Sequence, residues 1–322
     1  MTLWGHARSA ASLAVITANL AFWLVLVLAL SLLRLVLPGF RPTALRLLER
    51  IYRAAVHVDD FWLRRVVGLH WSLPALPLDP RRSVLVVSNH VAWSDVFLIQ
   101  SLLVRHGLVV KFLTKRELLA LPIVGLILWA FEFPILRRTR RGGRGGGADR
   151  DRDREAVERR ELDFEALREA CRSARENPVV LVSFAEGTRA TAVRRASRST
   201  PYRHLLPPRV GGFGALCDGL GEALAGIVDC TLVYSRANER SKSHSAAAGG
   251  PARPTRDVTF WEFLSGESIE VVIQAEWIDP GELPAQREER AHWLAERWAI
   301  KDERIDRLRQ GTHRRDASRS RF

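Results

Sequence analysis

Cysteine is scarce in this chain, and the few copies present argue against a disulfide-based scaffold. Only Cys171, Cys217 and Cys230 occur among 322 residues. An odd count in a chain of this length does not suit a disulfide framework, so a reducing compartment fits better and all three thiols are expected to pack in the core. The nine histidines are scattered, and none forms a cluster with cysteines or carboxylates at ligand spacing. The sequence therefore predicts no metal site.

Lysine is also rare, because only four of the 49 basic residues are Lys and the rest are Arg. Against 36 acidic residues this gives a formal net charge of +13. Such a balance suits nucleic acid, an anionic membrane surface or phosphorylated substrates, and does not choose among them. The 47% hydrophobic and 26% charged contents are near the globular average. They argue against a wholly disordered chain and against a transporter with many spans.

One long apolar run is present, and it predicts a membrane anchor. Ser9 to Leu33 is a stretch of 25 residues without a charge, and as a helix it exceeds the roughly 30 Å thickness of the hydrocarbon core. A cleaved signal peptide is the alternative, but the run is longer than the core of such peptides and no small-x-small site ends it. Arg8 alone precedes the run, whereas Arg34, Arg41, Arg46 and Arg50 follow it. This asymmetry predicts a single pass with the C-terminal bulk in the cytoplasm, and the membrane expected is the cell inner membrane.

The next segment has the pattern of an amphipathic helix. Its apolar positions at helical spacing are Leu48, Ile51, Ala55, Val58, Trp62 and Val66. Such a helix can lie along the membrane interface or pack on the core of the protein, and the sequence does not distinguish the two. We therefore expect an N-terminal membrane anchor and amphipathic helix at residues 1–70, a folded domain at 71–303 and a basic tail at 304–322.

Several apolar, β-branched runs predict buried strands. They span Ser83 to Val87, Leu108 to Leu113, Phe133 to Leu136, Val179 to Phe184, Ile227 to Tyr234 and Ile269 to Ala275. Helical segments such as Asp95 to Arg105 and Leu162 to Arg175 lie between them. The fold class expected from this alternation is α/β, with a central, mostly parallel sheet flanked by helices. The uncharged stretch Leu118 to Phe131 is too short to span a bilayer and predicts a helical segment that is buried or dips into the membrane.

Low-complexity stretches interrupt this pattern. Residues 138–160 and 235–256 are rich in Gly, Arg, Asp or Ser and are expected to be flexible insertions. The first is interpreted as a solvated loop, although a segment that covers or regulates the site is the alternative. The Arg- and Ser-rich end from Arg304 onward is expected to fray.

The first stretch that suggests chemistry follows the predicted strand at Ser83 to Val87. It reads Ser-Asn-His-Val-Ala-Trp-Ser-Asp and ends at Asp95, at the edge where α/β sheets place their active sites. A carboxylate five residues after His90 can hold the Nδ1 proton and leave Nε2 free as a base for a hydroxyl. A structural hydrogen-bonded pair or a helix cap is the alternative at this spacing.

The second stretch follows the predicted strand at Val179 to Phe184. It continues as Ala-Glu-Gly-Thr-Arg and ends at Arg189. An acid, a glycine, a hydroxyl and an arginine at a strand end can offer backbone N–H groups and a guanidinium to an anionic group. A turn with a surface arginine is the alternative.

Together, in this order and about 95 residues apart, the two stretches resemble the glycerolipid acyltransferase family, which has Asn-His-x-x-x-x-Asp followed by Phe-Pro-Glu-Gly-Thr-Arg. Ala185 stands where the family usually has Pro. The intervening block also resembles the family, at Lys115-x-Glu117-Leu118, Pro122, Gly125 and Phe133 to Arg138. Tyr202 to Gly212, Val228 to Thr231 and Trp298-x-x-Lys301-Asp302 resemble a branch that includes bacterial membrane acyltransferases. The resemblance covers Arg81 to Asp302 and identifies residues 71–303 as an acyltransferase domain.

The resemblance implies transfer of a fatty acyl group from acyl-CoA or acyl-carrier protein to the hydroxyl of lysophosphatidate, giving phosphatidate in phospholipid biosynthesis, with no further cofactor. It implies that His90 is the general base and that Asp95 orients it and stabilises the imidazolium. The acceptor's phosphate and glycerol are assigned to Glu186, Gly187, Thr188 and Arg189, with Lys115 and Arg137 as additional phosphate contacts.

Two alternatives remain at this point. A related acyltransferase that uses another lysophospholipid or an aminolipid acceptor carries the same motifs. A membrane-anchored nucleic-acid-binding protein is more remote, because the Arg-Gly run lacks interleaved aromatic residues and is offset by Asp149, Asp151 and Asp153.

Overall fold

The computed structural model describes residues 1–136, 149–236 and 257–317, and it describes side chains in these ranges outside 149–160 and 310–317. Its centre is a five-stranded sheet with the order β2-β5-β1-β6-β7. The strands are β1 (Ser83–Ser88), β2 (Val109–Phe112), β5 (Val179–Phe184), β6 (Leu224–Arg236) and β7 (Ile269–Ile278). All neighbouring pairs are parallel except β6 and β7. The predicted α/β class with a mostly parallel sheet is therefore confirmed.

Burial explains why the central strands could be located from sequence. Every residue of β1 is buried, as expected for a parallel strand that is covered by helices on both faces and therefore appears as a continuous apolar run. The predicted strand at Phe133 to Leu136 differs, because only β4 (Ile135–Leu136) forms there. It pairs with β3 (Thr114–Lys115) in a separate two-stranded sheet.

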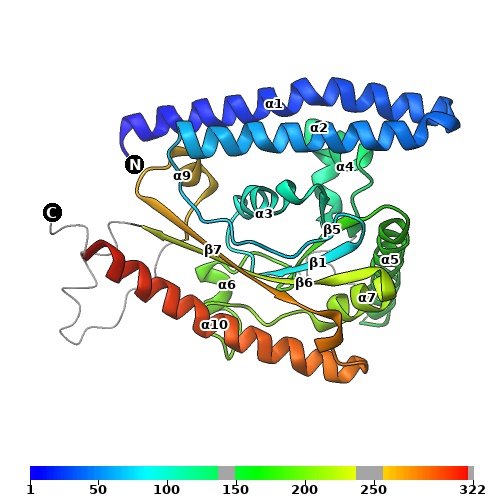
Figure 1. The fold of residues 1–322 in the computed structure, drawn as a ribbon. Helices are drawn as coiled ribbons and strands as arrows, with labels where there is room; N and C mark the ends of the chain where they lie inside the picture. The colour runs from blue at the N-terminus through cyan, green and yellow to red at the C-terminus, as the bar shows by residue number, and fades with distance from the viewer. Residues whose placement is uncertain (137–148, 237–256, 318–322) are drawn as a thin grey trace.

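Helices cover the sheet in two layers (Figure 1). On one side lie α1 (Leu3–Val36), α2 (Arg41–Phe61), α3 (Asp95–Leu103), α4 (Pro122–Ala130) and α9 (Phe260–Ser265). The other helices are α5 (Asp149–Glu176), α6 (Ala192–Ala196), α7 (Val210–Leu220) and α10 (Arg287–Ala317). Of these, α10 crosses the opposite side of the sheet (Figure 1). The three cysteines are free and buried, which confirms their expected packing.

The apolar helix α1 is docked on the rest of the protein along its length. Near its start, Ser9 and Ser12 donate hydrogen bonds to the carbonyls of Trp261 and Leu264, at 2.7 and 3.0 Å. Near its end, Arg34 donates to the carbonyl of Ala130 at 3.0 Å. By length and composition α1 is the one helix of the described residues that qualifies to cross a membrane.

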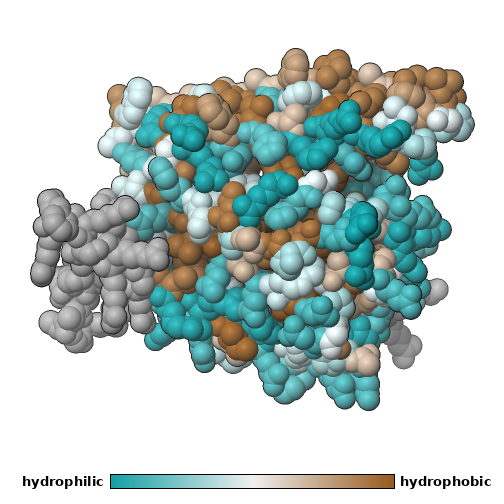
Figure 2. Space-filling model, in the orientation of Figure 1, coloured by the Kyte–Doolittle hydropathy of each residue, from teal (hydrophilic) through white to brown (hydrophobic). Residues whose placement is uncertain are grey.

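The face of α1 that does not contact the protein is strongly apolar. Its exposed large side chains are Leu3, Trp4, Leu13, Phe22, Val25, Leu26, Leu32, Leu33, Leu35 and Val36. Figure 2 shows hydrophobic residues gathered along the upper edge of the molecule, where α1 lies in Figure 1. A continuous apolar surface of this kind marks a contact with a membrane or another protein.

The second helix packs on the core of the protein along one face, which is one of the two options that the sequence leaves open. Its buried face is Ala44, Leu48, Tyr52, Val56 and Asp59. The expected stripe was wrong at Val58 and Val66, which are 42% and 50% exposed. The reason is that two polar side chains belong to the buried face. Tyr52 accepts a hydrogen bond from Gln100 at 3.0 Å, and Asp59 accepts one from Asn19 at 2.9 Å.

Two expectations of flexibility differ from the structure. Residues 149–160 form the first turns of α5 rather than an irregular insertion, because Arg and Glu are good helix formers and no Gly or Pro interrupts the segment. The helix α10 runs through the expected domain boundary at 303/304, and Arg304 and Ile305 are buried. The other parts of the two predicted insertions, 138–148 and 237–256, lie outside the described residues.

Candidate active site

The site begins where β1 ends, and a side chain fixes that strand end to its neighbour. Asn89 exchanges two hydrogen bonds with the backbone of Leu232 in β6. Its Nδ2 donates to the carbonyl at 2.9 Å, and its Oδ1 accepts from the N–H at 2.8 Å. The chain then turns before α3 starts at Asp95. The residue after Asn89 is therefore held at the carboxyl edge of the sheet.

That residue is His90, and the structure joins it to Asp95 as the sequence predicts. Its Nδ1 lies 2.8 Å from Oδ2 of Asp95. The same carboxylate oxygen accepts hydrogen bonds from the N–H groups of Val91 and Ala92, at 2.7 and 3.1 Å. The structure therefore shows the hydrogen-bonded pair and the turn-capping contacts together, because one carboxylate holds both the turn and the imidazole.

The second oxygen of Asp95 is bound by a residue that the sequence analysis did not identify. The hydroxyl of Tyr234, at the end of β6, donates to Oδ1 at 2.6 Å and accepts a hydrogen bond from Ser94 at 2.8 Å. Burial, followed by the charge of Asp95, holds the pKa of Tyr234 well above its usual range. The phenol therefore stays protonated as a donor. Among the described residues, no Lys or Arg forms an ion pair with the fully buried Asp95.

The imidazole of His90 is oriented by stacking as well as by hydrogen bonding. Its ring lies parallel to that of Phe184, with centroids 4.0 Å apart and an interplanar angle of 17°. Phe184 in turn stacks on Phe112 at 5.9 Å. The His90 side chain is 18% exposed. Since Nδ1 faces Asp95, Nε2 is the nitrogen that can take a proton from a substrate.

The loop after β5 is bound directly to the His90 loop, so the two sequence motifs meet. The N–H of Ala190 donates to the carbonyl of His90 at 2.7 Å, and the N–H of His90 donates to Oε1 of Glu186 at 3.3 Å. Gly187 makes the turn possible, because its φ of +67° is in the left-handed region that favours glycine.

Glu186 is fully buried and faces backbone on both sides. Besides the His90 contact, its Oε2 accepts a long hydrogen bond from the N–H of Leu206 at 3.4 Å. Burial raises the pKa of this carboxyl to about 8, and the charge of Asp95 adds to the shift while that of Lys301 opposes it. The sequence expected Glu186 to bind the acceptor, whereas its observed contacts join the His90 loop to the loop around Leu206.

Arg189 remains free for an anion among the described residues. Its guanidinium lies over the ring of Trp93 at 5.2 Å from the centroid, and no described carboxylate is within ion-pair distance. Partial burial lowers the pKa of Arg189, and the charge of nearby Arg194 adds to this effect. Thr188 is also partly exposed beside it. A half-buried guanidinium with no carboxylate partner is suited to bind phosphate.

The two additional phosphate contacts expected from sequence are on or next to the small β3–β4 sheet. Lys115 is exposed on β3, in the small β3–β4 sheet. Arg137 directly follows β4 and lies outside the described residues. Within the described ranges, no three His, Cys, Asp or Glu side chains are grouped so that they could hold a metal ion.

Tyr234 and Phe184 are the site residues that sequence reasoning missed. Phe184 is the last residue of β5 and the first residue of the second motif, but the sequence analysis gave it no role. Its position beside His90 follows from the parallel pairing of β1 with β5. Tyr234 is 139 residues from Asp95 along the chain. The signal for it is weak, since a polar-tipped aromatic at the end of an apolar strand only suggests that its hydroxyl needs a partner.

Comparison with known proteins identifies the family. The family described as Acyltransferase matches residues 73–235, about half of the chain. The chain therefore belongs to the acyltransferase family. This membership favours an enzyme over the nucleic-acid-binding alternative.

Individual relatives make the resemblance more specific. The chain is 31% identical over 136 residues to a Mus musculus protein named 1-acyl-sn-glycerol-3-phosphate acyltransferase epsilon, covering 39% of this chain and 34% of that protein. It is 25% identical over 271 residues to 1-acyl-sn-glycerol-3-phosphate acyltransferase 3 of Arabidopsis thaliana, covering 80% of this chain and 62% of that protein. The chain thus covers about one third of the length of the first relative and under two thirds of the length of the second.

A solved structure shares the fold. The 1-acyl-sn-glycerophosphate acyltransferase PlsC from Thermotoga maritima aligns with a TM-score of 0.51 at 17% identity, over 94% of this chain and 95% of that one. The similarity therefore extends over the N-terminal helices as well as the sheet.

Proposed function

We propose that this acyltransferase moves a fatty acyl group from acyl-CoA or acyl-carrier protein to the free hydroxyl of lysophosphatidate, giving phosphatidate for phospholipid biosynthesis. The hydroxyl oxygen bonds to the thioester carbonyl carbon, and the carbon–sulfur bond breaks. His90 takes the hydroxyl proton at Nε2 and returns it to the departing thiolate. The observation that carries this proposal is the His90–Asp95 contact of 2.8 Å at the carboxyl edge of β1.

The partners of Asp95 support the role of His90 as base. The structure gives Asp95 two backbone N–H groups, a phenol and the imidazole as partners, and no Lys or Arg of the described residues forms an ion pair with it. These donors fix the carboxylate without cancelling its charge. The charge is therefore available to stabilise the imidazolium that forms when His90 accepts a proton.

Acceptor recognition is proposed to rest on Arg189, with Gly187 and Thr188 beside it. The guanidinium has no carboxylate partner among the described residues and can bind the phosphate of lysophosphatidate in a bidentate manner. Lys115 and Arg137 are proposed as more distant phosphate contacts. For Glu186 the burial favours a role in joining the loops around the site instead of direct contact with the acceptor.

The membrane is the proposed partner of the exposed apolar face of α1, since both the lysolipid and the product reside there. We propose attachment to the cell inner membrane with the catalytic domain in the cytoplasm. The single pass expected from sequence requires α1 to leave its contacts with α9 and α4. The docked arrangement supports the alternative in which α1 lies along the membrane surface with its apolar face in the lipid.

A labelling experiment separates the two orientations. In a Thr2→Cys variant the native thiols remain buried, so an impermeant maleimide reports on the N-terminus. A single pass places this cysteine outside intact spheroplasts, where it is labelled. An α1 that lies along the cytoplasmic surface is labelled only after the cells are opened.

The reaction is tested by transfer of a radiolabelled acyl group from acyl-CoA to lysophosphatidate, beside lysophosphatidylcholine, lysophosphatidylglycerol and an aminolipid acceptor. Arg189→Lys keeps the charge but loses the bidentate geometry. We expect lysophosphatidate to be the preferred acceptor, and we expect KM for it to rise at least about tenfold in this variant. Preference for a phosphodiester or aminolipid acceptor would contradict the proposed substrate but not the chemistry. If acyl-CoA gives no transfer, acyl-carrier protein is tested as donor, and inactivity with both contradicts the proposal.

A further inference from the structure

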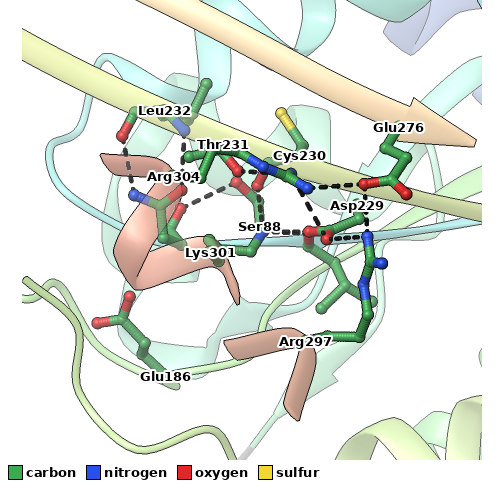
Figure 3. Close-up of polar contacts among 12 residues, drawn as sticks. Ser88, Glu186, Asp229, Cys230, Thr231, Leu232, Glu276, Arg297, Lys301 and Arg304 are labelled. Atoms are coloured by element: carbon green, nitrogen blue, oxygen red, sulfur yellow. Dashed lines mark hydrogen bonds and ion pairs between the residues drawn. The ribbon is translucent and has the colours of Figure 1, made fainter. Parts of the chain in front are cut away.

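A buried lysine reaches the underside of the active site from the last helix. Lys301 of α10 is fully buried, and its Nζ donates to the backbone carbonyls of Cys230 and Val87, at 2.5 and 3.2 Å. It also lies 2.5 Å from Oδ1 of Asp229. Figure 3 shows the contacts with Cys230 and Asp229 converging on the ammonium group. One side chain therefore connects β1, β6 and α10.

Both carbonyls belong to strands that lead into the site. Val87 precedes His90 by three residues on β1, and Cys230 precedes Tyr234 by four residues on β6. The next link along these strands is the pair of hydrogen bonds between Asn89 and Leu232. Beyond that link, Asp95 accepts hydrogen bonds from His90 and Tyr234, one from each strand end. The distance between the two strand ends therefore affects whether Asp95 can bind both.

Lys301 belongs to a cluster of five charged side chains. Arg297, Lys301 and Arg304 lie on one face of α10, since they are four and three residues apart. They meet Asp229 and Glu276, which are directly opposite one another on β6 and β7. Burial opposes the charge of Asp229, but Lys301, Arg297 and Arg304 together hold its pKa below the ordinary value.

Charge neutralisation alone does not explain Lys301. Arg297 contacts both carboxylates, Asp229 at 2.8 Å and Glu276 at 2.6 Å, and Arg304 contacts Glu276 at 2.7 Å. Each carboxylate therefore has an arginine partner without the lysine. Within the cluster, the contacts to the backbone of β1 and β6 come from Lys301. A compact ammonium on a long aliphatic stem suits this position, because it can donate to several oxygens converging from different elements.

We propose that Lys301 is a positioning residue for acyl transfer, whose ammonium group holds the end of β1 and the middle of β6 at the separation that lets His90 and Tyr234 bind Asp95 together. The kinetic part of this proposal rests on the proposed function. Lys301 acts through the two strands and does not touch the substrate. Its loss is expected to lower kcat and to leave the KM values for donor and acceptor nearly unchanged.

The test compares Lys301→Met with Arg297→Met, because each removes one cation from the same cluster and leaves a similar aliphatic chain. Only the first removes hydrogen bonds to the backbone of β1 and β6. We expect kcat to fall at least about tenfold in Lys301→Met, with both KM values within threefold of the native protein. In Arg297→Met we expect kcat to stay within threefold. Thermal unfolding of both variants measures how far each lowers stability.

Hydrogen–deuterium exchange gives a second readout that does not depend on activity. In Lys301→Met we expect faster exchange in residues 88–95 and 230–234, and in Arg297→Met we expect native protection there. Lys301→Gln, which keeps amide donors, replaces the methionine variant if that one does not fold, and is expected to show the same changes to a smaller extent. If the native protein transfers no acyl group, the proposed function is contradicted. The exchange data then test whether Lys301 positions the two strands, without reference to activity. Equal exchange in the two methionine variants, or a loss of kcat in both, overturns the positioning role.

Discussion

Two buried aspartates on opposite sides of the same sheet are satisfied in opposite ways. Asp95 is bound by backbone N–H groups, a phenol and an imidazole, and no Lys or Arg of the described residues forms an ion pair with it. Asp229 is surrounded by the cationic groups of Lys301, Arg297 and Arg304. Neutral donors fix a carboxylate and leave its charge uncompensated, whereas cations cancel the charge.

Under the proposed function, this difference assigns catalysis to Asp95 and structure to Asp229. In the proposed mechanism, proton transfer to His90 forms an imidazolium beside Asp95, and this ion pair favours the transition state over the ground state. Asp229 already has its cations before any reaction begins. Buried pairs of this second kind hold elements in register but add little that changes during a chemical step.

The largest effect is expected at His90. Replacing it in His90→Ala removes the proposed base, so kcat should fall about 10²- to 10⁴-fold. The melting temperature should change little, because the ring is at the edge of the core and Asp95 keeps three other donors. Acyl transfer and thermal unfolding are measured on the same preparation. A variant that retains native activity would rule out His90 as the base.

Removing the charge of Asp229 should lower the stability of the protein more than its activity. Asp229→Asn leaves three cations with only Glu276 to neutralise them, and removing one partner of a buried ion pair costs about 3 to 5 kcal/mol. We expect the free energy of unfolding to fall by this amount in denaturant titrations. A loss below about 1 kcal/mol would show that the cluster contributes little to the fold.

Glu186 is a third buried carboxyl, and its raised pKa should make the stability of the protein depend on pH. Its pKa is raised from 4.5 to about 8 in the folded protein, so the folded state holds a proton that the unfolded state releases. This contribution to stability is fully present below about pH 4.5 and is lost as the pH rises through about 8. Each pKa unit corresponds to about 1.4 kcal/mol.

The variant Glu186→Gln does not titrate, so it should show a flatter decline in melting temperature between these pH values than the native protein. The difference between the two curves isolates this one carboxyl from all other titrating groups. Parallel curves would mean that Glu186 is already ionised in the folded protein.

The smallest effect is expected at Tyr234. In Tyr234→Phe the ring still fills its buried space, but Asp95 loses one donor and Ser94 loses its acceptor. An unsatisfied buried polar group costs about 1 to 3 kcal/mol, and we expect kcat to fall by about tenfold or less. Unfolding and acyl transfer are compared with the native protein. A loss as large as that of His90→Ala would indicate that the phenol acts directly on the substrate.

Much of the fold could be predicted because buried parallel strands leave a clear signal. The runs predicted at Ser83 to Val87 and Val179 to Phe184 match β1 and β5 to within a residue. The pairing of His90 with Asp95 was also predicted, since a turn between a strand and a helix brings such residues together. Local spacing was sufficient for both.

The features that sequence reasoning missed depend on contacts between distant segments. Tyr234 and Lys301 reach the site from β6 and α10, and neither position shows a local pattern that reveals its partner. The buried face of α2 was misjudged because Tyr52 and Asp59 are polar but find partners on α3 and α1. A hydropathy pattern cannot indicate which polar groups will be satisfied by hydrogen bonds in the folded protein.

The most direct test of this account compares Asp95→Asn and Asp229→Asn in the same acyl-transfer assay, with kcat expressed per folded molecule. If the uncompensated charge of Asp95 stabilises the imidazolium of His90, Asp95→Asn should lower kcat at least about 10²-fold. Asp229→Asn should lower it less than tenfold despite its larger effect on stability. Equal losses of kcat in the two variants would contradict the distinction between a catalytic and a structural carboxylate.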